Sequence, residues 1–231
     1  MKAKVNTLLA LSLLAFAPAI FAQYTVTLTG VGDGAVANGV FVSPYVGTIQ
    51  QGTSSGPTVY TGYMICDDFT TASYLNSSWT ATETSSGSLN GTEKFTGSVM
   101  FQNTTYTAQQ AYNAAAWLAT QLVLPSNVTN AAAQTNLSFA IWNIFDGGNA
   151  SSSSAVTALE KTAFTTYDNT VQSTVSVYTP ATSNPNGKNQ SQEFLVVNPK
   201  AAPEIDPTSA ASALTLLLGG LVVFRDRKVR I

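Results

Sequence analysis

The chain has 231 residues, and only 10% of them are charged, against about a quarter in an average soluble domain. It has no histidine, which removes the commonest zinc ligand and the base of Ser-His-Asp catalysis. One cysteine, Cys66, excludes an intrachain disulfide. Between Gln23 and Pro203, nine acidic and four basic side chains give a net charge of −5. We therefore expect no nucleic-acid partner, because phosphate binding needs a basic surface.

Residues 1–22 have the three parts of a secretory signal peptide. Lys2 and Lys4 supply positive charge, residues 8–17 form an apolar run, and small residues end at Ala22. The apolar run is too short to span a bilayer comfortably. We expect passage through the export translocase and cleavage after Ala22, with a retained N-terminal anchor as the alternative.

Residues 23–101 are typical of short β-strands. Polar and apolar side chains alternate over residues 24–29, which is the period of a half-buried strand. Residues 58–65 predict another strand, and it ends at Cys66. Glycine-rich turns between such short segments favour a sandwich or a barrel.

Residues 105–168 change to a helical period. Thr107 and Gln110 fit a capping box, and apolar stripes then predict two helices and a weaker third. Residues 171–198 return to strand patterns. We therefore predict an α+β fold over residues 23–198: a short-stranded antiparallel sandwich or barrel with an inserted unit of two to three helices.

The C-terminal end combines a proline-containing linker, an apolar segment and a basic tail. Residues 199–207 form a linker, and residues 208–224 are uncharged. These 17 residues reach the lower limit for a transmembrane helix. The basic tail, residues 225–231, should stay in the cytoplasm. The residues that define this pattern are Pro203, Glu204, Pro207, Arg225, Arg227 and Lys228.

This order of parts resembles the PEP-CTERM sorting signal. The resemblance implies that an exosortase, a membrane transpeptidase-like protease, processes the chain near Pro203-Glu204. It also implies transient or permanent anchoring in the inner membrane, then delivery to the cell surface or an exopolysaccharide matrix. The chain departs from the Pro-Glu-Pro motif at Ile205, which leaves the position of the cut open. A plain C-terminal anchor without processing is the alternative.

The body resembles a type common among PEP-CTERM proteins and, more distantly, the thioester domains of bacterial surface adhesins. Cys66-Asp-Asp-Phe69, Trp117-Leu118 and Ala140-Ile-Trp142 carry the resemblance. In such domains, a cysteine thiolate attacks a glutamine carboxamide two residues before the Ala-Ile-Trp run. Ammonia leaves, and the thioester can later acylate an amine or hydroxyl of a target.

In this chain the glutamine position of the motif holds Ser138, which cannot form the bond. Gln134 lies one helical turn earlier, about 6 Å along the axis. The pattern therefore favours a retained fold without the reactive bond, with Cys66 as a buried thiol. A thioester between Cys66 and Gln134 is the alternative.

Two aspartates and three tryptophans are the remaining candidates for a binding site, and each also has a purely structural interpretation. Asp67 and Asp68 favour a turn cap over a metal site, because no further acidic ligands follow at loop spacing. Trp117 and Trp142 favour the core over a sugar-stacking surface, whereas Trp79 is expected to be exposed. No metal or cofactor is predicted.

Three functions follow, and the first is favoured. It is a non-enzymatic structural or adhesive protein of the cell surface or matrix, with exopolysaccharide or surface glycans as partners. The second is a covalent adhesin that uses a Cys66 thioester. The third is an extracellular polysaccharide hydrolase, which needs two carboxylates about 5–10 Å apart.

Overall fold

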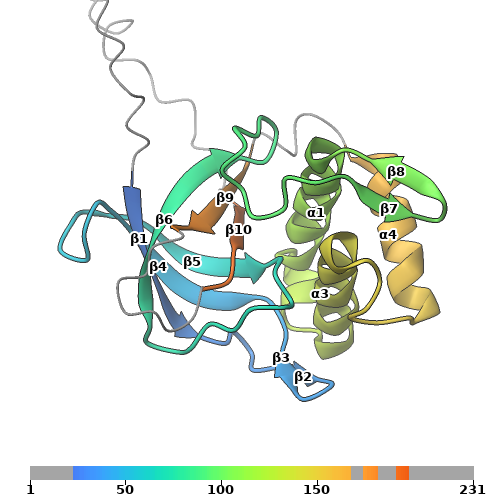
Figure 1. Ribbon diagram of the computed structural model, residues 1–231. Coiled ribbons are helices and arrows are strands. Elements are labelled where there is room, and N and C mark those ends of the chain that lie inside the picture. Colours follow the sequence, from blue (N-terminus) through green and yellow to red (C-terminus); the bar gives the residue numbers. More distant parts are fainter. Residues whose placement is uncertain (1–22, 168–173, 182–190, 198–231) are drawn as a thin grey trace, which may run out of the picture.

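The computed structural model describes residues 23–167, 174–181 and 191–197, and it combines a barrel with a group of helices (Figure 1). Six antiparallel strands close the barrel in the order β1-β4-β5-β10-β9-β6. The mixed helix-and-strand prediction is confirmed, and a barrel is formed. The strands are β1 (Gln23–Gly30), β4 (Tyr45–Gln51), β5 (Thr58–Cys66), β6 (Ser78–Ser85), β9 (Val175–Pro180) and β10 (Phe194–Val197).

Closure of the barrel depends on strands that are far apart in the sequence. β1 pairs with β4 on one side and with β6 on the other, so Val26 faces both Ile49 and Trp79. β10 lies between β5 and β9. Each of the six strands therefore has two neighbours, so the barrel formed by the described residues has no open sheet edge.

Two small hairpins extend from this framework. The first joins β2 (Val36–Ala37) to β3 (Val40–Phe41), and the second joins β7 (Val99–Phe101) to β8 (Thr104–Tyr106). Asn38 and Gly39 both have positive φ, at 52° and 79°. That conformation suits a tight two-residue hairpin turn, which asparagine and glycine adopt most readily.

The helical part contains four helices within the described residues: α1 (Ala108–Leu122), α2 (Pro125–Val128), α3 (Ala131–Asp146) and α4 (Ser154–Thr166). Thr107 and Gln110 form the predicted capping box at the start of α1. α3 ends at Gly147, whose φ of 64° is the left-handed conformation that glycine tolerates. The three predicted helices correspond to α1, α3 and α4, and the short α2 was not predicted.

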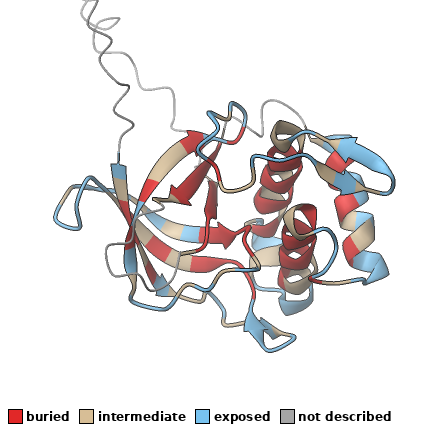
Figure 2. Cartoon of the chain, in the orientation of Figure 1, coloured by how far each residue is buried: buried red, intermediate tan, exposed pale blue. Residues whose placement is uncertain are grey.

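One continuous apolar core joins the barrel to the helices (Figure 2). Ile49, Ile65 and Phe194 fill the barrel side, and Leu118 and Ile141 fill the helical side. Burial of each such side chain contributes about 1.5–3 kcal/mol. The strand ends and the helices therefore meet at a packed junction, where Cys66 lies.

The expected targeting segments lie outside the described residues. These are the signal peptide (1–22), the linker (199–207), the apolar segment (208–224) and the basic tail (225–231). Within the described ranges, none of the helices combines the length and hydrophobicity needed to cross a bilayer.

Candidate functional site

Cys66 ends β5 at the junction between barrel and helices, where its side chain is fully buried. Its backbone N–H donates to Ser43 Oγ at 3.0 Å, and its carbonyl accepts from Trp142 Nε1 at 2.9 Å. The fully buried thiol donates to the Asp68 carbonyl at 3.2 Å. Burial, and then the nearby charge of Asp67, raise the pKa of Cys66 well above its usual value. Because the thiolate is the nucleophile, this environment disfavours reaction.

The structure does not join Gln134 to Cys66. The Gln134 amide donates to the Val128 carbonyl, and it lies 3.4 Å from Asp33 Oδ2. Ser138, one turn later on α3, donates instead to the Ser43 carbonyl at 3.4 Å. Trp142, a further turn along, reaches Cys66 itself. Two turns of α3, about 11–12 Å, thus separate Gln134 from the residue that contacts Cys66.

A second group of polar side chains is buried beside Cys66. The Asp67 N–H donates to the Glu193 carbonyl at 3.4 Å, which brings the two acids together. Glu193 accepts hydrogen bonds from the hydroxyls of Tyr112 and Thr179, and from the Lys94 N–H at 2.9 Å. Asp67 is also fully buried, and neither of its oxygens receives a hydrogen bond from the described residues.

Burial raises the pKa of both acids, and the charge of Glu193 raises that of Asp67 further. Hydrogen bonds from Thr179, Tyr112 and the Lys94 N–H oppose the rise for Glu193. Because the two acids interact, their titration belongs to the pair, and a proton on the pair relieves the repulsion between the two carboxylates.

Asp68 forms the predicted local cap, whereas the side chain of Asp67 has no such hydrogen bond among the described residues. Its Oδ1 accepts from the Thr70 N–H at 3.2 Å, the Thr70 hydroxyl at 3.1 Å and the Thr71 N–H at 3.2 Å. Its Oδ2 forms an ion pair with Lys94 Nζ. In the part of the chain that the structure describes, no group of three His, Cys, Asp or Glu side chains is arranged to hold a metal ion.

The buried acids do not form a glycosidase site in this structure. Such a site needs two carboxyl groups that reach a substrate. Asp67 and Glu193 are both fully buried. Neither is among the residues that line the two cavities of about 700 and 260 Å³.

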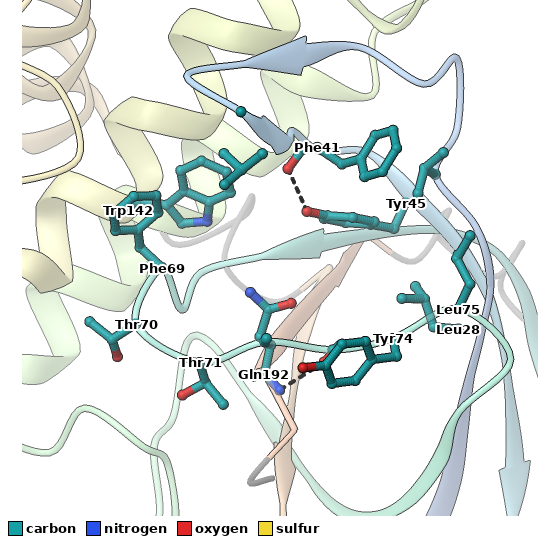
Figure 3. A pocket seen from close by; sticks show the side chains of 15 residues that line it. Leu28, Phe41, Tyr45, Phe69, Thr70, Thr71, Tyr74, Leu75, Trp142 and Gln192 are labelled. Carbon is teal, nitrogen blue, oxygen red and sulfur yellow. Dashed lines mark hydrogen bonds between the residues drawn. The ribbon is translucent and has the colours of Figure 1, made fainter.

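An open groove of about 700 Å³ lies between the β2–β3 hairpin and the segment 69–75 (Figure 3). Its walls carry five aromatic side chains: Phe41, Tyr45, Phe69, Tyr74 and Trp142. Two of these rings reach solvent, since Tyr74 is 59% exposed and Phe41 is 47% exposed. The other three are held in place by packing and hydrogen bonds.

Specific contacts fix the floor of the groove. The Tyr45 hydroxyl donates to the Phe41 carbonyl at 2.7 Å, and the Phe69 and Trp142 rings lie 5.2 Å apart. Gln192 donates through its backbone N–H to Ser73 Oγ at 2.9 Å and through Nε2 to the Asp68 carbonyl at 2.8 Å. The groove is therefore largely pre-formed, as small-ligand sites usually are.

The groove contains polar atoms but no charge. Thr70, Thr71, Ser73 and Gln192 supply hydroxyl and amide groups, and no charged side chain is among the residues that line it. Lys94 donates to the Thr71 hydroxyl next to the groove, but its charge is paired with Asp68.

The sequence pattern does not predict this groove. The pattern favours the core for Trp117 and Trp142. For Trp142 this is confirmed, because its side chain is 2% exposed although it also lines the groove. Trp117 is partly buried and packs against the core. The expectation that Trp79 is exposed is wrong: it is 7% exposed and stacks on Phe194 inside the barrel. Tyr74 was the available signal, as an aromatic residue in a polar segment without strand alternation.

Comparisons of this chain with protein-family models, with curated proteins and with solved structures find no match.

Proposed function

We propose that this protein is a non-catalytic adhesive component of the cell surface or extracellular matrix, and that its groove binds a neutral glycan. The observation that carries the proposal is the uncharged, aromatic-lined groove of about 700 Å³. A volume of this size accommodates a small ligand or a short stretch of a polymer.

The chemistry of the walls favours sugars over other ligands. The C–H faces of a pyranose ring can pack on exposed aromatic rings, and Tyr74 and Phe41 offer such rings. Sugar hydroxyls can pair with neutral groups such as those of Thr70, Ser73 and Gln192. An anionic polymer would find no cation in the groove, and the net charge of the body would repel it.

The proposed localisation of the protein depends on the segments at its two ends. We propose that the export translocase moves the chain and that residues 1–22 are then removed. An exosortase-like protease processes the tail near Pro203-Glu204, after the apolar segment 208–224 has held the protein in the inner membrane. The net charge of −5 between Gln23 and Pro203 agrees with a site of action away from nucleic acid.

Affinity electrophoresis tests the binding proposal. Native gels are cast with either a neutral polysaccharide or a polyuronic acid, and migration of the purified protein is compared with migration in a plain gel. Retardation is expected in a neutral-polysaccharide gel alone. Equal migration in every gel, or retardation only by the polyanion, would contradict the proposal.

Cell fractionation tests the proposed localisation independently of glycan binding. The chain is expressed with a reporter placed after Ala22, with and without residues 203–231. The full chain is expected in the membrane and at the cell surface, and the shortened chain in the medium. A full chain that stays in the cytoplasm would overturn the sorting proposal without affecting the binding test.

A further inference from the structure

The ion pair between Lys94 and Asp68 has features that a simple surface pair lacks. Asp68 lies just after β5, and Lys94 lies 26 residues later in the segment between β6 and β7. The carboxylate of Asp68 is fully buried, whereas Lys94 keeps 25% of its side-chain surface. An amine nitrogen and a carboxyl group are thus held in contact at a mostly dehydrated position.

We propose that Lys94 Nζ and Asp68 Cγ join in an intramolecular isopeptide bond. The proposal does not depend on what the groove binds.

The reaction balances without another reagent. One proton passes from the Lys94 ammonium to Oδ2 of Asp68, which leaves a neutral amine and a neutral carboxyl. The amine lone pair attacks Cγ, the C–N bond forms, and the Cγ–Oδ2 bond breaks. Oδ2 leaves as water with a second proton from the nitrogen. No oxidant, cofactor or metal is needed, and the product is an amide plus one water.

The surroundings of Asp68 supply the stabilisation that this attack needs. Oδ1 accepts two backbone N–H bonds, from Thr70 and Thr71 at 3.2 Å each, and a hydroxyl bond from Thr70 at 3.1 Å. These donors are positioned to hold the negative charge that develops on Oδ1 in the tetrahedral intermediate. Oδ2 faces Lys94 and is therefore the oxygen that leaves.

The amine is also positioned. Lys94 Nζ donates to the Thr71 hydroxyl as well as to Asp68, and it lies 5.7 Å from the centre of the Phe95 ring. The Lys94 backbone N–H is fixed by Glu193 at 2.9 Å. Holding two reactants in contact replaces a bimolecular step by an intramolecular one, with effective concentrations of about 10⁵ M or more.

Two neighbouring acids, Asp67 and Glu193, favour binding of a proton close to Asp68. Asp67 and Glu193 have raised pKa values, because they are buried together beside Asp68. A proton held there reduces the negative charge around Asp68, which helps Oδ2 to leave as neutral water. The exposed part of Lys94 gives that water a way out.

The bond would tie the strand end at β5 to the segment that precedes β7. The chain has one cysteine and cannot form this kind of link as an internal disulfide. An amide is not reduced by thiols, so the link would persist wherever the protein is exported.

Trypsin digestion of the denatured full chain tests the proposal, because trypsin cleaves after a free lysine and not after an acylated one. Lys161 is the internal control, since it is exposed on α4. The linked protein is expected to be cut after Lys161 but not after Lys94. The fragment that contains both Asp68 and Lys94 should be lighter than its sequence by about 18 Da, one water.

Matched variants sharpen the test. Lys94→Arg keeps the charge and the ion pair but cannot form the amide, so it should have the full sequence mass, be cut after residue 94 and melt at a lower temperature. Lys161→Arg should keep the mass deficit. A deficit of about 17 Da with cleavage after Lys94 would identify a thioester instead and overturn the proposal. Full mass with cleavage after Lys94 in the wild type would overturn it as well.

Discussion

The buried polar corner around Asp67 and Glu193 and the aromatic groove that Gln192 lines differ in how far their side chains are exposed to solvent. In the corner, polar groups are covered by protein, and the hydroxyls of Tyr112 and Thr179 donate hydrogen bonds to Glu193. In the groove, Tyr74 and Phe41 are large apolar side chains left open to solvent. Charged groups that look catalytic in the sequence therefore support the fold, whereas neutral residues form the accessible surface.

The difference has a physical reason. Burying a carboxyl group costs several kcal/mol unless it is paired or protonated, so such groups persist where the fold uses them. Leaving an aromatic ring exposed forgoes the stabilisation of burial and marks a surface that meets a partner. Changes in the corner should therefore affect stability, and changes in the groove should affect binding.

Trp142→Ala should give the largest loss of stability, because Trp142 belongs to the junction core and bonds the Cys66 carbonyl. We expect a loss of about 3–5 kcal/mol in the free energy of unfolding. Urea denaturation followed by circular dichroism measures it. A change of under about 1 kcal/mol would place this side chain outside the core.

Tyr112→Phe should cost less and act through the two hydrogen bonds of the Tyr112 hydroxyl. The hydroxyl of Tyr112 donates to Glu193 and accepts from the Phe95 N–H at 3.2 Å. Its removal leaves buried groups without a partner, at a cost of about 1–3 kcal/mol. The same denaturation curves test this. Tyr106→Phe is the control, since no hydrogen bond of that hydroxyl is found among the described residues, and it should change stability by under about 0.5 kcal/mol.

The corner should also make stability depend on pH. Since the folded pKa of Asp67 lies above its unfolded value of about 4, its stabilising effect is complete below that value and is lost as pH rises through the folded pKa. Asp67→Asn removes this titration. The variant should gain stability relative to the wild type as pH rises from 4 to the folded pKa of Asp67. Parallel pH profiles for the two proteins would contradict the assignment.

Cys66 offers a smaller, yes-or-no test. Its thiol is fully buried, and its pKa is raised by burial. Iodoacetamide should leave the folded protein unmodified and alkylate it completely in denaturant. Rapid alkylation of the folded protein would mean that the thiol is accessible. Resistance in denaturant would instead mean that the sulfur is acylated.

Much of the local structure could be predicted from the sequence. The capping box at Thr107 and Gln110 and the position of Cys66 at a strand end follow from neighbouring residues alone. The meeting of Glu193 with Asp67 could not be predicted, because it depends on β10 pairing with β5 across more than 100 residues. The groove depends on how a hairpin and the 69–75 segment pack together, which no periodicity encodes.

The central claim is that exposed aromatic side chains of the groove bind a neutral glycan. The most direct test is a calorimetric titration of a polysaccharide that retards the wild type, repeated with Tyr74→Ala and Tyr63→Ala. Tyr63 is 38% exposed on β5 and does not line the groove. We predict about tenfold weaker binding for Tyr74→Ala and unchanged binding for Tyr63→Ala, with both variants as stable as the wild type. Equal affinity in all three proteins would contradict the claim.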